Sequence, residues 1–375
     1  RTLELRSPMS CAGNLTITAG TLDTKSGTNH ALTVGTLGAA GQTGVIVDGT
    51  LTLNSSTCIL TNLAGTGTLN APTTTIIIRD RAEAGTYAGK AIDVDNMTVN
   101  NDLKIELTSA KAQDLDLGDD KIHDLTINND TDARQNYMVQ SGSIDGDLTI
   151  TRGILNTFNR VLTVDGNCSI AADGKLEANV NGNVAVNLGS LTIASGGEYD
   201  ATSATTTING LAAESDNGTF RFEDGANFTH NSGTVTFAGA TDANIEMEGG
   251  HSGRKTPTNP LKFHNLTSAV TGPYLNLYVD FTVEATFTIT ADSTYGVSVR
   301  QPVYLTMGTA TAQGTIAGPS SGTSNIYFAT EATTSKILAT NTDGLYPWIK
   351  TGNDWGWSAG NGSTINLENG DYQTT

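Results

Sequence analysis

Cysteine and basic residues are scarce in this chain of 375 residues, and each shortage excludes a class of protein. The three cysteines, Cys11, Cys58 and Cys168, are odd in number and far apart. They form no CxxC pair, so the sequence predicts neither a disulfide framework nor a cysteine zinc site. Lysine and arginine total 20 against 38 acidic residues, which gives a net charge of −18. Such a surface repels phosphate groups, so we expect no nucleic-acid partner.

Long apolar runs are missing as well. No stretch approaches the ~20 apolar residues that a membrane helix needs, so we expect no membrane insertion. Hydrophobic residues make up 37% of the chain and aromatic residues 6%, which is little for a globular enzyme. The histidines show no HxH or HExxH spacing, and we expect no metal site and no cofactor. They are scattered along the chain at His30, His123, His230, His251 and His264.

The chain is instead rich in small and polar residues. The chain has 42 glycines and is rich in threonine and asparagine. Threonine is branched at its β-carbon and favours strands over helices, whereas glycine and asparagine favour turns. The composition therefore predicts an all-β protein of many short strands joined by tight turns.

Two phrases recur along the chain. LTITAGTLDT at residues 15–24 returns at seven of ten positions as LTITRGILNT at residues 148–157. VDGTLTL at residues 47–53 returns as IDGDLTI at 144–150 and as VDGNCSI at 164–170. Apolar residues alternate with Thr or Ser in each copy, which predicts strands with one buried face. More strands of this kind are predicted to begin at Leu32, Met97, Leu125, Leu162, Leu191 and Phe287.

The Asp-Gly pair that opens the second phrase is a turn signal. Glycine adopts positive φ without strain, and aspartate bonds its own backbone. Within the phrase, Cys168 stands where Leu51 and Leu148 stand in the sister copies. We therefore expect Cys168 to fill a core position as a small apolar residue, in preference to acting as a nucleophile.

Each repeat is too short to bury its own apolar face, so the copies must stack on one another. The spacing between successive repeats is irregular, as in stacked coils with loops of variable length. The sequence thus predicts a parallel β-solenoid (β-helix) of short Thr/Gly/Asn-rich repeats. The alternative is a tandem antiparallel β-sandwich, in which the Asp-Gly pairs form hairpin turns.

The repeat pattern fades near residue 290, which predicts two domains. Residues 1–290 form the β-solenoid repeat region, and residues 291–375 form a C-terminal β cap or tip. The tip contains all three tryptophans, and aromatic faces beside amide and carboxylate groups are a common surface for binding sugars. The alternative is that these rings form the hydrophobic plug of the cap. The candidate ligand-binding residues are Tyr346, Trp348, Trp355 and Trp357.

Acidic side chains form two clusters. Asp114, Asp116, Asp119 and Asp120 lie close together, and Asp145 and Asp147 flank a glycine. Carboxylates can bind Ca²⁺ or act as the pair of a glycosidase, but no calcium-loop spacing is present. Solvated acids in turns are the other interpretation. We assign no catalytic residue.

The repeated phrases resemble those of repetitive structural proteins of tailed bacteriophages, over about residues 13–290. Bacterial surface adhesins of the autotransporter and filamentous-haemagglutinin type share this repeat style. The phage resemblance implies a virion component, such as a fibre, tailspike or capsid-surface protein that forms homo-oligomers. A tailspike would also imply glycan cleavage.

Three functions follow as hypotheses. The first is a non-enzymatic structural protein of a phage virion, a rigid fibre or surface protein that mediates attachment to a host or surface. Its partners would be further copies of itself, for example in a homotrimer, other virion proteins and a cell-surface glycan. The second is a bacterial extracellular adhesin or filament subunit. The third is a glycan-degrading β-helix enzyme. The first two place the protein on a virion surface or outside the cell.

Overall fold

The computed structural model describes most of the first 317 residues and short strands beyond them. The described residues are 1–35, 44–79, 90–109, 112–179, 183–210, 220–247, 253–271, 274–290, 296–300, 303–309, 314–317, 324–328, 336–339, 348–350 and 355–359. This part of the chain contains strands and turns and no helix, and hence no helix that could cross a membrane. The chain divides into two compact units, Arg1–Gly182 (unit 1) and Asn183–Thr375 (unit 2).

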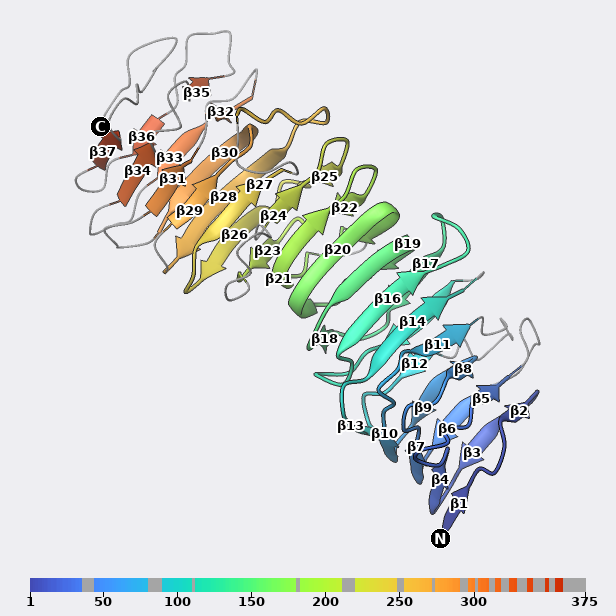
Figure 1. The fold of residues 1–375 in the computed structure, drawn as a ribbon. Helices are drawn as coiled ribbons and strands as arrows, with labels where there is room; N and C mark the ends of the chain where they lie inside the picture. The colour runs from blue at the N-terminus through green and yellow to red at the C-terminus, as the bar shows by residue number, and fades with distance from the viewer. Residues whose placement is uncertain are drawn as a thin grey trace. The chain divides into compact units, whose positions relative to one another are not determined.

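Unit 1 is built from three columns of parallel strands. The chain visits the columns in turn, so that β1, β2 and β3 are followed by β4, β5 and β6 one layer further on (Figure 1). The β1 column contains β1 (Thr2–Glu4), β4 (Thr21–Asp23), β7 (Thr50–Thr52), β10 (Thr68–Asn70) and β13 (Thr98–Asn100).

The other two columns of unit 1 continue through more layers. The β2 column contains β2 (Met9–Cys11), β5 (Leu32–Val34), β8 (Cys58–Leu60), β11 (Ile76–Arg79), β14 (Lys104–Thr108), β16 (Asp124–Asn128), the start of β19 (Leu148–Asn156) and the middle of β20 (Leu162–Glu177). The β3 column contains β3 (Leu15–Ile17), β6 (Val45–Val47), β9 (Leu63–Gly65), β12 (Ile92–Asp93), β15 (Gln113–Asp116), β17 (Gln135–Met138) and the ends of β19 and β20. The short strand β18 (Gly142–Ile144) pairs with the start of β20.

Unit 2 repeats this arrangement with two long columns. The β23 column contains the start of β21 (Val186–Ile193), β23 (Thr205–Ile208), β26 (Thr234–Gly239), the ends of β28 (Lys262–Val270) and β30 (Phe281–Ile289), β33 (Thr315–Ala317) and β36 (Trp348–Lys350). The β24 column contains the end of β21, β24 (Phe220–Phe222), β27 (Ala243–Glu246), β29 (Tyr274–Leu277), β31 (Gly296–Val299), β34 (Ser324–Phe328) and β37 (Trp355–Ala359).

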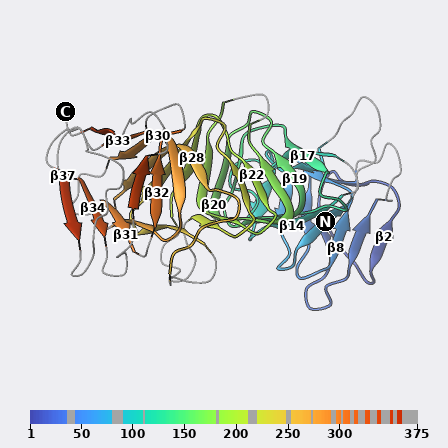
Figure 2. The same cartoon turned by 90° about the horizontal axis from the view of Figure 1, so that it is seen from above.

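The remaining strands of unit 2 pair on a third side. There β22 (Glu198–Asp200) pairs with β25 (Asn227–Thr229), and the starts of β28 and β30 pair with each other and then with β32 (Tyr304–Met307) and β35 (Lys336–Ala339). Figure 2 shows the same strands from above. All these pairings are parallel, so the antiparallel alternative is wrong for these strands. The strands after residue 290 pair in the same columns, and the predicted division at 290 stays a prediction.

The alternation read from the sequence places the core correctly. In β16, Leu125 and Ile127 are fully buried and Thr126 lies between them on the outside. The same in-out-in order holds in β5, β20, β21 and β30. Each fully buried Leu or Ile side chain contributes about 1.5–3 kcal/mol to folding, so a column of such strands is held by its thin apolar interior.

Similar phrases do not occupy similar places. Leu15–Ile17 of the first phrase forms β3 and pairs with Val45–Val47, whereas the second copy opens with residues 148–150 in the β2 column. Cys168 is fully buried and pairs in register with Leu148, which confirms it as a core residue. Leu51 is fully buried as well, but it lies in the β1 column and does not stack in line with Cys168.

The Asp-Gly pairs need glycine for a reason other than the one predicted. Gly49, Gly146 and Gly166 do not have positive φ, so that prediction is wrong. A β-carbon on Gly146 would lie 2.5 Å from both the Asp124 Oδ1 atom and the His123 carbonyl oxygen of the layer before it. One on Gly166 would lie 2.4 Å from the Gly146 oxygen. The glycines recur because successive layers approach too closely for any side chain.

Candidate functional site

The predicted ligand-binding residues lie at the end of unit 2. Tyr346 falls outside the described residues. The backbone of Trp348 pairs with Thr315, and the backbones of Trp355 and Trp357 pair with Ser324 and Ile326. The side chains of these tryptophans fall outside the described part, so the binding of sugars at this tip stays a prediction.

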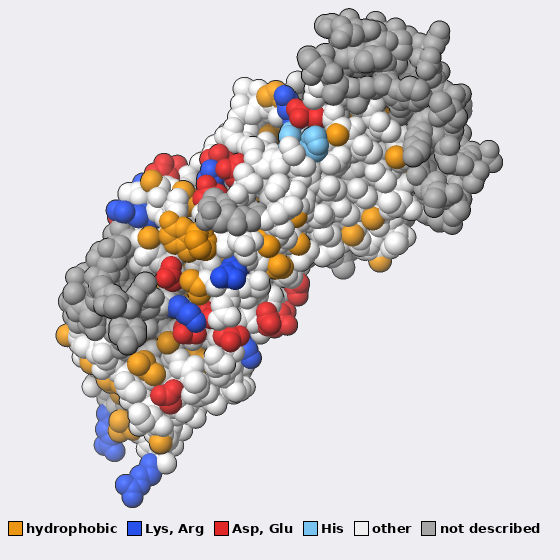
Figure 3. All heavy atoms as spheres, turned by 180° about the vertical axis from the view of Figure 1, so that it is seen from behind, with side chains coloured by type: hydrophobic (Ala, Val, Ile, Leu, Met, Phe, Trp, Pro, Cys, Tyr) orange, Lys and Arg blue, Asp and Glu red, His pale blue; other side chains and the backbone are white. Residues whose placement is uncertain are grey.

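Threonine side chains form two neutral rows on the outside of the β23 column. All of them are half-buried, and each lies in register with its neighbour in the next layer, about 4.8 Å away. The first row is Thr205, Thr234, Asn265, Thr286 and Thr315, and the second is Thr207, Thr236, Thr267, Thr288 and Ala317. Figure 3 shows a broad part of unit 2 in white, the colour of the backbone and of uncharged polar side chains, with histidines at its edge. These rows contain no carboxylate and no base.

The structure separates the first acidic cluster. Asp116 is 1% exposed, and its Oδ2 atom accepts hydrogen bonds from the Lys90 Nζ atom at 2.5 Å and the Gln140 Nε2 atom at 2.6 Å. Asp120 lies in an exposed turn, where its carboxylate accepts a hydrogen bond from the Ser143 hydroxyl at 2.7 Å. Asp116 and Asp120 therefore take part in two separate structural contacts and do not share a site.

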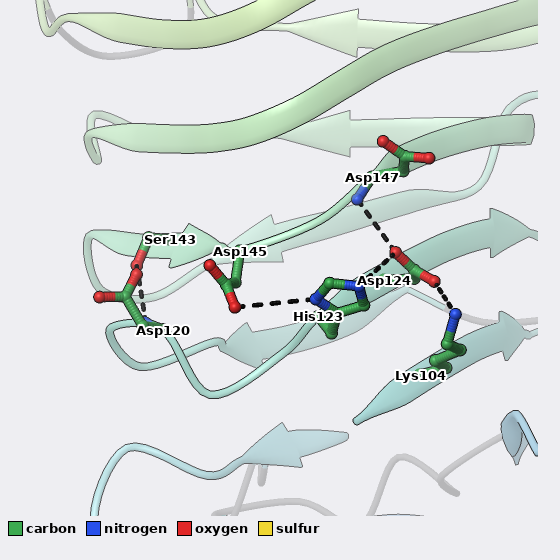
Figure 4. A network of polar contacts seen from close by, with 7 residues as sticks. All are labelled: Lys104, Asp120, His123, Asp124, Ser143, Asp145 and Asp147. Carbon is green, nitrogen blue, oxygen red and sulfur yellow. Dashed lines mark hydrogen bonds and ion pairs between the residues drawn. The ribbon is translucent and has the colours of Figure 1, made fainter. Parts of the chain in front are cut away.

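Asp147 of the second acidic cluster belongs to a polar ladder that runs along the starts of β14, β16 and β19 in the β2 column. Figure 4 shows Asp124 between Lys104 and Asp147, which come from the layers before and after it. The Lys104 Nζ atom lies 2.6 Å from the Asp124 Oδ2 atom, and the Asp147 amide donates to the Asp124 Oδ1 atom at 3.1 Å. One layer further on, the Asn167 amide donates to the Asp147 Oδ1 atom at 2.8 Å. Each carboxylate thus binds a backbone amide of the next layer.

His123 lies between two of these carboxylates. Its Nδ1 atom is 3.7 Å from the Asp145 Oδ2 atom, and its Nε2 atom is 3.9 Å from the Asp124 Oδ1 atom (Figure 4). Both distances are too long for hydrogen bonds, so the ring interacts with the carboxylates through charge when it is protonated.

This ladder suits a structural role better than acid-base chemistry. Partial burial opposes ionisation of Asp124, but the hydrogen bonds from Lys104 and the Asp147 amide outweigh it and lower the pKa of Asp124. A glycosidase needs a carboxylic acid with a raised pKa beside an ionised partner. Asp124 is held in the ionised form that accepts hydrogen bonds, and it is unsuited to donating a proton.

A surface hollow of about 340 Å³ lies on the outer side of the β2 column in unit 1. Its lining mixes hydroxyl and aliphatic groups with one cation, Arg79. Besides Arg79, it is lined by Ser10, Ala12, Thr33, Val34, Gly35, Ile59, Leu60 and Thr61. Among these lining residues there is no carboxylate, histidine or cysteine, so the hollow brings no catalytic pair together.

Sequence reasoning missed a cluster in unit 2. It treated the histidines as scattered, but His230 and His264 stack with ring centroids 5.6 Å apart, and Glu284 lies beside them. Burial lowers the pKa of His230 more than the charge of Glu284 raises it. His230, His264 and Glu284 are far apart in the sequence, and nothing local indicated that they would lie in neighbouring layers.

Comparisons with known protein families, with curated proteins and with solved structures give no match for this chain.

Proposed function

We propose that the chain is a parallel β-solenoid with a structural function and no chemical step. The observation that supports it is the regular return of the chain to the same columns, layer after layer, with every named pairing parallel. Continuous backbone ladders and a stacked apolar interior make such a column stiff. The carboxylates of the polar ladder accept hydrogen bonds from backbone amides of the next layer, which is a structural role.

The proposed setting is a virion surface or an extracellular filament, where the protein associates with copies of itself. A chain with net charge −18 is repelled by its copies at long range. The neutral threonine rows of the β23 column are where copies approach without placing carboxylates against one another. The virion and the bacterial adhesin remain two forms of the same proposal, since both depend on a stiff, displayed scaffold.

Light scattering on the purified full chain tests this proposal. We expect an oligomer, with a solution mass of two or more times the 39.0 kDa of one chain, and a trimer is one expected state. Thr236→Lys combined with Thr267→Lys adds charge to the neutral rows and should shift the mass toward the monomer. A monomer in the unaltered protein at all concentrations contradicts self-association.

A cleavage screen tests the absence of a chemical step. Bacterial polysaccharides are incubated with the protein, and new reducing ends are measured. We expect none. Reducing ends that disappear in Asp145→Asn would establish a glycan-degrading enzyme in its place.

A further inference from the structure

Three consecutive layers of unit 2 each place one side chain at the same corner. His230 lies in the turn between β25 and β26, His264 lies in β28, and Glu284 lies in β30. The pairing of β28 with β30 shifts register between Phe263 and Asn265, so that His264 stands opposite two residues of β30, Glu284 and Ala285. Such irregularities re-aim side chains, and here His264 and Glu284 both lie on the outer side, beside Asn265 and Thr286 of the first threonine row.

The potential ligand atoms of these side chains are close together. The His230 Nε2 atom is 3.1 Å from the Glu284 Oε2 atom, and one atom from each of the three side chains lies within 4.8 Å of the others. All three are half-buried. Ligand atoms that share one tetrahedral zinc ion at about 2.0–2.1 Å lie roughly 3.3 Å apart. The His230–Glu284 pair is close to that spacing, and the ligand atom of His264 lies within 4.8 Å of the other two.

We propose that His230, His264 and Glu284 form a binding site for a divalent transition-metal ion of the zinc type. Two imidazole nitrogens and one carboxylate are the donors that such ions prefer. Ca²⁺ and Mg²⁺ take oxygen ligands, so this donor set selects against them. An ion bound here joins three layers of unit 2 and stabilises their stacking, which goes beyond the structural function proposed above.

The turn that carries His230 is held in place before any ion binds. The Gly233 amide donates to the His230 carbonyl oxygen at 2.8 Å, and the Asn231 side chain donates to the Ala201 carbonyl oxygen at 2.8 Å. Asn231 and Ser232 have φ of 45° and 62°, a strained conformation that these bonds maintain. The histidine is therefore fixed near the corner, and ion binding does not have to order a loop.

The proton on the His230 ring must move when an ion binds. The Ser232 amide donates to the Nδ1 atom at 3.0 Å, so Nε2 carries the proton of the neutral ring and donates to Glu284. An ion on Nε2 shifts this single proton to Nδ1 and ends the bond from Ser232. Two N–H donors then face each other, so the ring must turn away from the Ser232 amide, and water at this exposed position accepts from both groups.

Lys262 competes with a bound ion. Its Nζ atom is 3.6 Å from the Glu284 Oε1 atom, the oxygen that faces away from His230, and its side chain is 49% exposed. The ammonium group repels a cation at the site but can swing into solvent. Removing this charge should therefore tighten metal binding, whereas removing a ligand should weaken it.

Titration of the full chain with Co²⁺ and Zn²⁺ tests the site, in excess Mg²⁺ to occupy the acidic surface. We expect one saturable equivalent with visible Co²⁺ absorption, displaced by Zn²⁺. His264→Gln and Glu284→Gln should each weaken binding by at least about tenfold, since even residues that only support metal ligands change affinity by 10–100-fold. Lys262→Met should tighten it. His30→Gln and Cys11→Ser are matched controls that should bind as the unaltered protein does.

Thermal unfolding gives a second measurement. Zn²⁺ that binds the folded chain raises its melting temperature, and this rise should be lost in Glu284→Gln. The proposal is overturned if no saturable Co²⁺ absorption appears. It is also overturned if His264→Gln and Glu284→Gln bind the metal as tightly as the unaltered protein does. If either ligand variant fails to fold, Lys262→Met still decides: unchanged or weaker binding in that variant contradicts the site.

Discussion

The two units share their strand pattern but fill their interiors differently. Every buried hydrophobic residue described in unit 1 is aliphatic or contains sulfur, and the ring of Phe158 is 43% exposed. The described residues of unit 2 include seven buried aromatic side chains, namely Tyr199, Phe220, Phe222, Phe237, Phe263, Phe281 and Phe287. The ring centroids of Phe220 and Phe263 are 5.8 Å apart, and those of Phe263 and Phe281 are 5.6 Å apart.

The alternating pattern is therefore the same in both units, whereas the size of the buried residues differs between them. The strands of neighbouring layers lie ~4.8 Å apart, and aromatic rings are large enough to contact one another across that distance. A pair of rings therefore buries a wider contact area between two layers than a pair of leucines does. Close glycine contacts between layers occur in both units, at Gly146 in unit 1 and at Gly239 in unit 2, and unit 1 adds the polar ladder at Asp124. Unit 2 relies on rings, and we propose that it also relies on a metal ion.

The aromatic interior is where the largest effect is expected. Phe220→Ala should cost about 3–5 kcal/mol because the ring contacts several neighbours and leaves a cavity. Hydrogen exchange measured by mass spectrometry should show faster exchange in β24 and β27 and little change in unit 1. Phe158→Ala, which removes an exposed ring, should change stability by less than about 0.5 kcal/mol. Equal effects of the two would contradict the comparison.

The close glycine contacts of unit 1 come next. Gly146→Ala forces a β-carbon against Asp124 and the His123 carbonyl group, and should cost about 1–3 kcal/mol. Gly13→Ala is the matched control, since no atom lies within 4 Å of its β-carbon and its φ is not positive. We expect Gly13→Ala to be neutral or slightly stabilising in urea unfolding. A neutral Gly146→Ala would show that the layers can separate locally.

The polar ladder should give a smaller, pH-dependent effect. The folded pKa of Asp124 is lowered, so its contribution is present at neutral pH and is lost as pH falls below about 4. Asp124→Asn should cost about 0.5–1 kcal/mol at pH 7, because the Lys104 pair is partly exposed. Urea unfolding at pH 7 and pH 3 checks this. A loss that persists unchanged at pH 3 would show that shape, and not charge, matters.

Thiol reactivity should separate the cysteines without changing stability. Burial raises the pKa of Cys58 and of Cys168 to about 12, so neither forms a thiolate in the folded protein. Cys11 is only partly buried. A thiol reagent should therefore modify one cysteine rapidly and the other two only on unfolding. Cys11→Ser should abolish the rapid phase, and rapid labelling of Cys168 would contradict its place in the core.

Much of the fold was predictable because alternation is local. Residues such as Leu125, Thr126 and Ile127 reveal their inner and outer sides within three positions, so the all-β class and many strands followed directly. The candidate site was less predictable. The acidic residues around Asp116 lie close in sequence, yet the side chains point to different partners once the strand and its turn form.

The sequence by itself determined which residues face the interior, because a strand has a period of two wherever it lies. The tertiary structure decided which strands become neighbours, because that depends on how much chain each loop uses between layers. It placed the two LTIT phrases in different columns and pressed Gly146 against Asp124. It also brought His230, His264 and Glu284 from three separate layers to one corner.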